Sequence, residues 1–401
     1  MVKGYLVEEQ GKLSKKNIRL YLSAEFLWNV ARTFPHAILT IFLMSLGVTL
    51  GKIALLQIFY MVASILMEFP SGVLSDHWSR KKVYIISTVF ILISYALIYV
   101  SKGNFMVLSV AWTLYGVSAA LRSGTLDNEI VLEIREQKLD LERFSVVETY
   151  LFSISFILGA FIGSILYERI YNGIYVITML LFAGSLVISC FYISWIKNSH
   201  NPDIGKTGII EETKKGLRLF VNERTLRMIV LLFTVLSLFV QPLYQFWQVL
   251  YNEKEIALIY FGYVYVILQV ANMVGSALYK RIAYKYQYSY VLLILIPILF
   301  ILEVIYFDSL AFFIGFPIVV TLFYMYYQFI LVYMREQSPK EYISTFTSLI
   351  GTFTNISSIA VLGIMSILFR YMSIVYVYGI MFVVFAVISM VLLLKNYKKE
   401  D

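Results

Sequence analysis

The side chains best placed to do chemistry are carboxylates and basic groups set inside long apolar runs. Glu25, Arg32 and His36 follow one another at spacings of seven and four residues, which predicts one shared helical face. Glu68 and Glu148 are further carboxylates in apolar runs of the same half of the chain. Burial raises a carboxyl pKa and a nearby cation lowers it, so such a group can load and release a proton. Static ion pairs that merely permit burial are the alternative interpretation.

The second half of the chain offers amides and aromatic rings without charge. Gln241, Gln245 and Gln248 form one stripe of an apolar run, and Tyr324 and Gln328 lie in a later run. Such groups suit an amphipathic or aromatic substrate, held by stacking and cation–π contacts. With 32 tyrosines in the chain, packing or interfacial roles are the alternative.

The sequence lacks the residues needed for disulfides, metal binding or nucleotide binding. There is one cysteine, Cys190, and the three histidines form no H-x-x-x-H pair, so we expect no disulfide framework and no metal site. No G-x-x-x-x-G-K-[ST] loop is present to cradle nucleotide phosphates. We therefore expect neither an enzyme nor a cofactor. Because the carboxylates in apolar runs can load and release protons, a proton gradient is the expected source of energy for whatever process this protein drives.

The elements that must position these groups are membrane-spanning helices. Hydrophobic residues make up 60% of the 401 and charged residues only 14%, where soluble domains carry about 25%. Backbone polar groups cannot stay unpaired in lipid, so apolar runs of about 20 residues predict helices. Twelve such runs predict an all-α integral membrane protein: 18–46, 53–74, 83–99, 105–121, 146–167, 175–196, 228–250, 256–278, 290–307, 310–334, 343–369 and 372–394.

The distribution of lysine and arginine orients these spans. Most of the 33 basic residues fall in the N-terminal segment and in alternate loops, and the opposite loops hold Lys52, Lys102, Arg169, Lys254 and Arg370. The positive-inside rule then predicts that both termini are cytoplasmic, in an inner or plasma membrane. The same distribution accounts for the net charge of +8 without a nucleic-acid partner.

A polar loop divides the spans into six and six. The first part of residues 197–227 contains Pro202 and Gly205, which predicts a flexible start. The later part has apolar residues among charged ones, which predicts an amphipathic surface helix. We expect an N-terminal half over 1–196 and a C-terminal half over 228–401.

One loop motif carries a family resemblance. The run from Gly72 to Lys82, GVLSDHWSRKK, resembles the cytoplasmic signature of the major facilitator superfamily, G-x-L-x-D-r-x-G-R-[KR], with Ser79 in the second glycine position. The resemblance implies two six-helix pseudo-repeats and a latch that stabilises the outward-facing state. In this chain the latch would comprise Gly72, Asp76 and Arg80, with Asp127 as the acid nearest to the arginine. Topological anchoring is the alternative role for the basic residues.

Other family patterns are only partly present. Gly275 begins a fainter copy of the motif about half the chain later, as duplicated halves would produce. Trp112 occupies the place, four residues before Gly116, where drug exporters often carry arginine. Gly159 and Gly163 keep two glycines of the antiporter pattern without its proline.

Together these features predict a monomeric secondary transporter in a lipid bilayer that exports a small amphipathic compound, such as a drug, peptide or metabolite, by proton-coupled antiport. Proton-coupled uptake of a nutrient or an anionic small molecule is a second possibility, with Arg32 as the anion-binding group. A receptor or lipid-handling scaffold without transport is a third, of another class.

Overall fold

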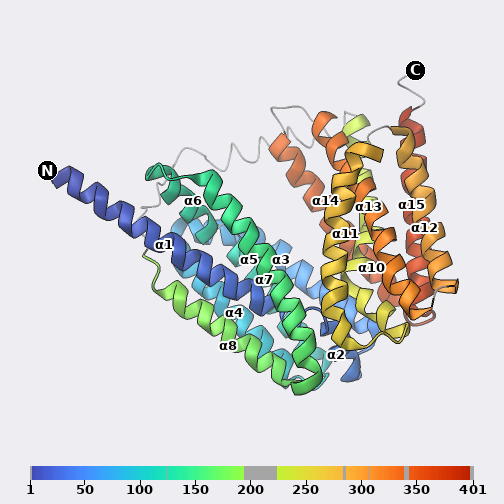
Figure 1. Ribbon diagram of the computed structural model, residues 1–401, viewed down its shortest axis with the longest axis horizontal. Helices are drawn as coiled ribbons and strands as arrows, with labels where there is room; N and C mark the ends of the chain where they lie inside the picture. The colour runs from blue at the N-terminus through green and yellow to red at the C-terminus, as the bar shows by residue number, and fades with distance from the viewer. Residues whose placement is uncertain are drawn as a thin grey trace. The chain divides into compact units, whose positions relative to one another are not determined.

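The computed structural model consists of helices and short connections. It describes residues 2–123, 125–193, 224–282, 286–306, 308–337 and 343–397. The described residues contain no strand, and their helices appear along the chain in Figure 1. The elements are α1 (Val2–Thr33), α2 (Leu39–Ser45), α3 (Leu50–His77), α4 (Arg80–Val100), α5 (Phe105–Arg122), α6 (Leu126–Glu136), α7 (Leu141–Ile170), α8 (Gly173–Cys190), α10 (Arg224–Glu253), η1 (Leu258–Tyr260), α11 (Phe261–Ile282), α12 (Tyr286–Tyr306), α13 (Ser309–Gln337), α14 (Ile343–Leu368) and α15 (Ile374–Tyr397).

Ten segments of these described helices are long and apolar enough to cross a membrane. In α12 the apolar part, Val291–Tyr306, is shorter, and α1 does not qualify because its first half is polar. The predicted all-helical membrane class is confirmed, whereas the count of twelve spans stays a prediction. The amphipathic helix expected within 197–227 lies almost entirely outside the described residues.

The first predicted span is wrong as a single helix. Instead of running from Ile18 to Leu46, the chain leaves α1 after Thr33 and starts α2 at Leu39. Pro35 explains the break, because proline lacks an N–H and disfavours helical geometry in the residue before it. His36 therefore lies in a turn, where its N–H bonds to the carbonyl of Thr33 at 3.0 Å, and not on the α1 face that carries Glu25.

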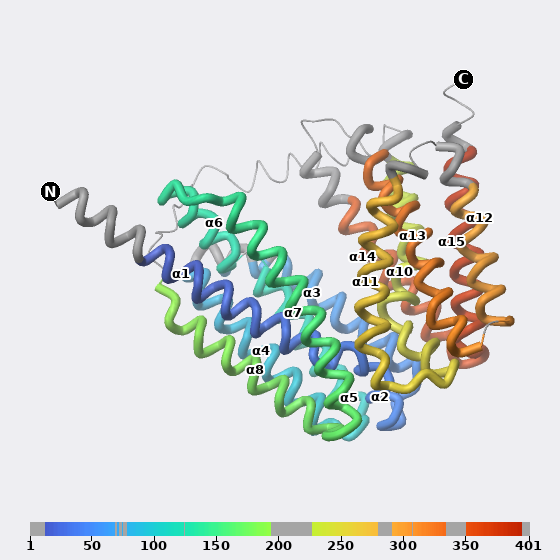
Figure 2. Tube along the Cα trace, viewed as in Figure 1, coloured from blue at the N-terminus to red at the C-terminus, as the bar shows by residue number. Residues whose placement is uncertain are grey.

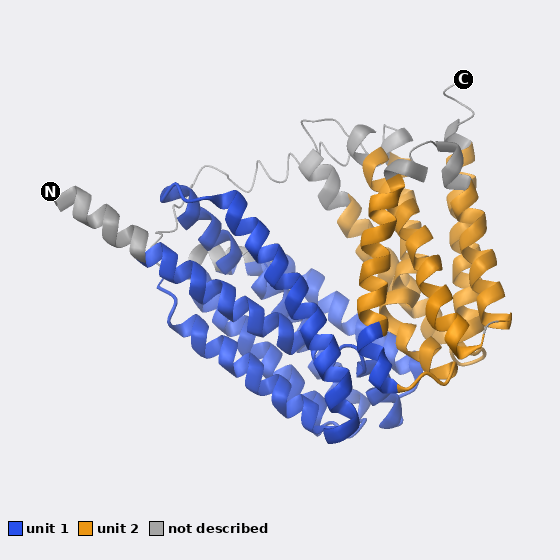
Figure 3. Cartoon of the chain, viewed as in Figure 1, with its two compact units in different colours: residues 1–200, 258–263 blue, residues 201–257, 264–401 orange. Residues whose placement is uncertain are grey.

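Unit 1, residues 1–200 with 258–263, is one of two compact units (Figure 3). Within it α1, α7 and α8 run side by side, and α5 packs against both α3 and α4 (Figure 2). Close contact between α7 and the end of α1 depends on glycine: a Cβ at Gly159 would overlap Thr33, and one at Gly163 would overlap the Phe34 carbonyl. These two glycines thus have a packing role, independent of any antiporter pattern.

Unit 2, residues 201–257 with 264–401, is built around α10, which packs against α13, α14 and α15. Its interior is rich in rings. Phe239 stacks on Phe323 with centroids 3.9 Å apart and on Phe382 at 4.1 Å. Because lipid is as apolar as these side chains, such close van der Waals packing is what holds helices together within a bilayer.

Candidate substrate and proton site

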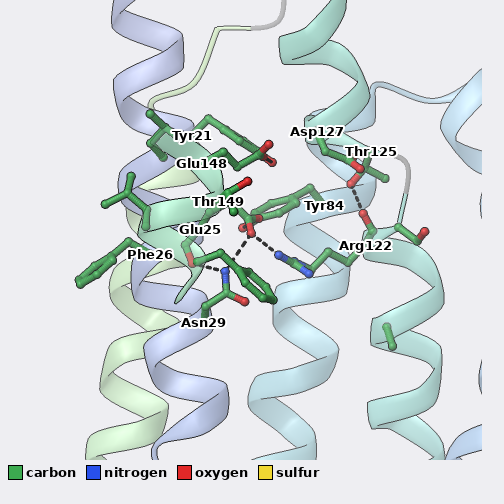
Figure 4. A pocket seen from close by; sticks show the side chains of 15 residues that line it. Tyr21, Glu25, Phe26, Asn29, Tyr84, Arg122, Thr125, Asp127, Glu148 and Thr149 are labelled. Atoms are coloured by element: carbon green, nitrogen blue, oxygen red, sulfur yellow. Dashed lines mark hydrogen bonds and ion pairs between the residues drawn. The ribbon is translucent and has the colours of Figure 1, made fainter. Parts of the chain in front are cut away.

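A cavity of about 460 Å³ lies within unit 1, among α1, α4, α5, α6 and α7 (Figure 4). Its lining includes three carboxylates and one guanidinium, namely Glu25, Asp127, Glu148 and Arg122. Aromatic and apolar side chains such as Phe26 complete the wall. The cavity therefore combines charge with apolar surface, as small-molecule sites commonly do.

The centre of this site is an ion pair between Glu25 of α1 and Arg122 at the end of α5. Tyr84 donates a hydrogen bond to Glu25 Oε1 at 3.0 Å, and Asn29 approaches Oε2 at 3.4 Å. The two charged side chains are 14% and 24% exposed, so both reach the cavity without being fully solvated. The Glu25 carboxylate thus combines an ion pair and two polar contacts with some exposed surface.

Arg122 is also held by an aromatic ring. Its Cζ lies 3.8 Å from the centroid of the Trp28 ring, a cation–π contact, and Trp28 itself packs edge-on against Phe182. The guanidinium is thus fixed between a carboxylate and a ring, so protonation of Glu25 would remove only one of its two attachments.

The other two carboxylates of the cavity have no ion-pair partner among the described residues. Glu148 of α7 is half-buried and accepts a hydrogen bond from Tyr21 at 2.8 Å. Asp127 is exposed in the first turn of α6. With all groups ionised, carboxylates outnumber cations in the lining.

Helix α6 is positioned by a buried polar network. Glu133 is fully buried; both its oxygens accept from Asn17 of α1, at 3.0 and 3.2 Å, and Oε1 also accepts from Tyr192 at 2.6 Å. Thr125 closes the turn from α5 by donating to the Arg122 carbonyl at 2.6 Å. These bonds fix where α6 begins, and hence where Asp127 faces the cavity.

Arg32, two helical turns after Glu25, belongs to a separate group. Its Nε donates to the Tyr115 hydroxyl at 3.1 Å, and Tyr95 reaches its carbonyl oxygen at 3.5 Å. The Tyr115 ring contacts those of Tyr60 and Tyr95, with centroids 5.2 and 6.0 Å away. Arg32 does not line the cavity that contains Glu25.

The residues of the predicted latch are only partly described. The surroundings of Gly72 and of the Asp76 side chain lie outside what the structure describes, and no ion pair joins Arg80 to Asp127, which are both described. Lys81 of the same motif donates to the carbonyl oxygens of Cys190 and Tyr192, each at 2.7 Å, and so caps the end of α8. The latch stays a prediction.

The remaining predicted residues lie elsewhere. Glu68 is exposed on α3 and does not line the cavity. In unit 2, Gln248 is buried, and Gln241, Gln245 and Gln328 are partly buried. The Tyr324 hydroxyl hydrogen-bonds to that of Tyr244.

Arg122 is the main residue that sequence reasoning missed, together with Tyr21, Asn29 and Tyr84. Its only signal was a cation directly after a predicted span, where positive-inside anchors are common. Glu303 was also missed, although a carboxylate in an apolar run was a visible signal. It lies on α12, is 3% exposed, and has one oxygen without a hydrogen-bond partner in the described structure.

Comparison with known proteins places this chain in a family. Residues 22–362 match the model of the Major Facilitator Superfamily. Among solved structures, the nucleoside transporter NupG is similar over 96% of this chain and 98% of its own, with a TM-score of 0.74 and 14% identity. A bacterial homologue of the iron transporter ferroportin covers 94% and 98%, with a TM-score of 0.67 and 15% identity.

A POT family transporter in complex with 5-aminolevulinic acid covers 95% and 96%, with a TM-score of 0.69 and 14% identity. Comparison with curated protein sequences gives no match. The family match extends over most of the chain and confirms the family that the GVLSDHWSRKK motif predicted. The fold agrees with this family. The chain therefore belongs to the Major Facilitator Superfamily and is a multi-pass membrane protein of this transporter family.

Proposed function

We propose that this protein is a proton-coupled secondary transporter that exports a small amphipathic compound by alternating access. In this proposal α1 and α12 join the ten apolar segments to make twelve spans, arranged as two six-helix halves with both termini in the cytoplasm. The transporter acts as a monomer in the cell membrane and uses the proton gradient in place of a cofactor.

The observation that carries this proposal is the Glu25–Arg122 ion pair at the wall of an accessible cavity. Protonation of Glu25 neutralises the carboxylate and removes its attraction for Arg122, which is anchored on a different helix. The contact between α1 and α5 then differs between the two protonation states. A ligand, here a proton, shifts a conformational equilibrium by such a difference in interaction energy.

The choice of substrate follows from the side chains, because members of one fold carry different cargoes. The cavity joins carboxylates to Phe26 and Phe152, so it offers both polar and aromatic contacts. These contacts support an amphipathic organic compound as cargo. The partial glycine pattern of α7 supports export only weakly, since Gly159 and Gly163 are explained by packing.

Transport by purified protein in lipid vesicles tests the proposal. We expect accumulation of one or more compounds from an amphipathic panel when a pH gradient is imposed, and its loss when a protonophore collapses the gradient. Glu25→Gln should abolish gradient-driven accumulation but keep exchange of labelled for unlabelled compound, because it mimics the protonated state permanently. Flux that ignores the gradient in the wild type would indicate a uniporter, and no flux for any compound would favour a receptor or scaffold.

Topology is tested separately. Cys190 is the only cysteine in the chain, so Cys190→Ser provides a background for single-cysteine labelling. Cysteine at Asn252, near the end of α10, should react with an impermeant reagent outside intact cells. Cysteine at Ser199 should react only after the membrane is opened. Labelling of Ser199 in intact cells would overturn the orientation.

A further inference from the structure

Arg32 is a cation inside unit 1 that forms no ion pair with an acidic side chain among the residues that the structure describes. Its guanidinium donates a hydrogen bond from Nε to Tyr115, its Cζ lies 5.9 Å from the centroid of the Trp28 ring, and Tyr60, Tyr95 and His36 lie near enough to interact with its charge. Arg122, by contrast, is paired with Glu25. Arg32 and Arg122 thus differ in whether a carboxylate neutralises them in the described structure.

The surroundings place Arg32 deep in the membrane. Arg32 lies beside Tyr115 of α5 and Tyr60 of α3, so their depth indicates its depth. Tyr115 is ten residues from the start of α5 at Phe105, and Tyr60 is ten residues from the start of α3 at Leu50. At a rise of about 1.5 Å per residue, ten residues correspond to about 15 Å, half of a bilayer core of about 30 Å. A charge at this depth is costly unless an opposite charge or water reaches it.

Around the guanidinium the polar groups are tyrosine hydroxyls, which are uncharged and can both donate and accept hydrogen bonds. The Arg32 cluster, defined as Arg32 with Tyr60, Tyr95 and Tyr115, contains hydroxyl groups and no carboxylate. Guanidinium has five N–H donors in a planar fork, and only Nε–H is used here. The Arg32 side chain is also only partly buried, so the unused donors keep accessible surface.

We propose that the Arg32 cluster binds an oxyanion group, a carboxylate or phosphate, of the transported compound. The planar fork matches such a group with two parallel hydrogen bonds, and the tyrosine rings supply the apolar contact that an amphipathic anion requires. This inference rests on the proposed transport function and makes the cargo an amphipathic anion or zwitterion. Seven residues separate Arg32 from Glu25, about 10 Å along α1, so the anion and the proton occupy different levels of the same helix.

Binding to the purified full-length protein, measured without any gradient, tests the inference. The probes share one ring and differ in charge: benzoate, phenyl phosphate, benzyl alcohol and benzylammonium. We expect the two anions to raise the thermal unfolding midpoint with increasing concentration, and the neutral and cationic probes to leave it unchanged. Equal effects of benzylammonium and benzoate would overturn the proposal, and so would equal effects of inorganic phosphate and phenyl phosphate, because the site would then not select an organic anion.

Variants locate the effect. Arg32→Gln should weaken anion binding by about tenfold or more, as expected for loss of charged hydrogen bonds. Arg32→Lys, which keeps the charge without the fork, should retain part of the affinity and guards against a folding defect. Arg169→Gln removes an exposed arginine at the end of α7 and should bind as the wild type does. Wild-type binding by Arg32→Gln would overturn the assignment.

The outcome is separable from that of the transport proposal. If the anions bind through Arg32 but a pH gradient drives no accumulation, proton coupling fails and the Arg32 site stands. If a gradient drives transport of neutral or cationic compounds only, and Arg32→Gln transports them normally, the Arg32 site fails and coupling stands.

Discussion

The two units differ in what fills their interiors. Unit 1 contains the Glu25–Arg122 pair, the Glu133 network and the unneutralised Arg32, each held by side chains from other helices. Unit 2 contains stacked rings around Phe239 instead. Buried charges require matched partners and accessible space, whereas rings require only close packing. The charged groups that we propose for proton coupling and anion binding therefore lie in unit 1.

Glu303 is the exception that makes this contrast testable. It is a nearly buried carboxylate in unit 2, and within the described residues it has no ion-pair partner. The carbonyl oxygen of the next residue, Val304, accepts a hydrogen bond from Lys254. A lysine ammonium group thus bonds to the backbone beside Glu303. Whether Glu303 takes part in coupling decides whether the contrast holds.

The largest effect is expected from breaking the ion pair of unit 1. Arg122→Met leaves the Glu25 carboxylate partly buried without its cation, which typically destabilises by about 3–5 kcal/mol. Thermal unfolding in detergent should show a marked drop for Arg122→Met and recovery when Glu25→Gln is added. Arg169→Met is the control for loss of an exposed arginine. An Arg122→Met protein as stable as the wild type would mean that the pair contributes little.

A smaller effect on stability is expected from substituting a glycine at a helix contact within unit 1, compared with a glycine of unit 2 that has open space beside it. Gly163→Ala introduces a Cβ that overlaps the Phe34 carbonyl, and overpacking of this kind costs about 1–3 kcal/mol. Gly363→Ala in α14 meets nothing within 4 Å and should be tolerated. Unfolding midpoints of the two variants compare a constrained and an unconstrained glycine. Equal midpoints would contradict the close packing of α7 on α1.

Within unit 1, Glu148→Gln should reduce gradient-driven transport by only about threefold, equivalent to about 0.7 kcal/mol. Glu148 accepts a hydrogen bond from Tyr21 but holds no cation in the described structure, so its neutralisation releases no helix contact. The exposed Glu68→Gln serves as the control and should transport normally. If Glu148→Gln loses all coupling while Glu25→Gln keeps it, the proton carrier lies on α7.

The smallest effect is expected from Glu303→Gln. It keeps the shape of a buried side chain and removes an ionisable group, so we expect normal gradient-driven transport and no loss of stability. Vesicle assays beside the wild type measure the first quantity, and thermal unfolding the second. Loss of coupling in Glu303→Gln would show that both units carry proton chemistry.

Much of the fold followed from sequence, because its signals are local. Long apolar runs predict membrane helices whatever surrounds them, and the GVLSDHWSRKK motif predicted the family. Local reasoning failed where one residue interrupts a run: Pro35 separates α1 from α2 and removes His36 from the shared face. The short helix α6, polar and amphipathic, gave no membrane signal and was not predicted.

The site depended on tertiary structure. The sequence identified Glu25 and Arg32 as unusual and predicted that the two share a helical face. Two helical turns separate them, about 10 Å, which is too far for an ion pair. The partner is Arg122, 97 positions away in the chain, and only the tertiary arrangement of the helices brings it to Glu25. Composition and periodicity therefore determined that this chain spans a membrane and which residues are costly to bury, while helix packing decided which opposite charge each of them meets.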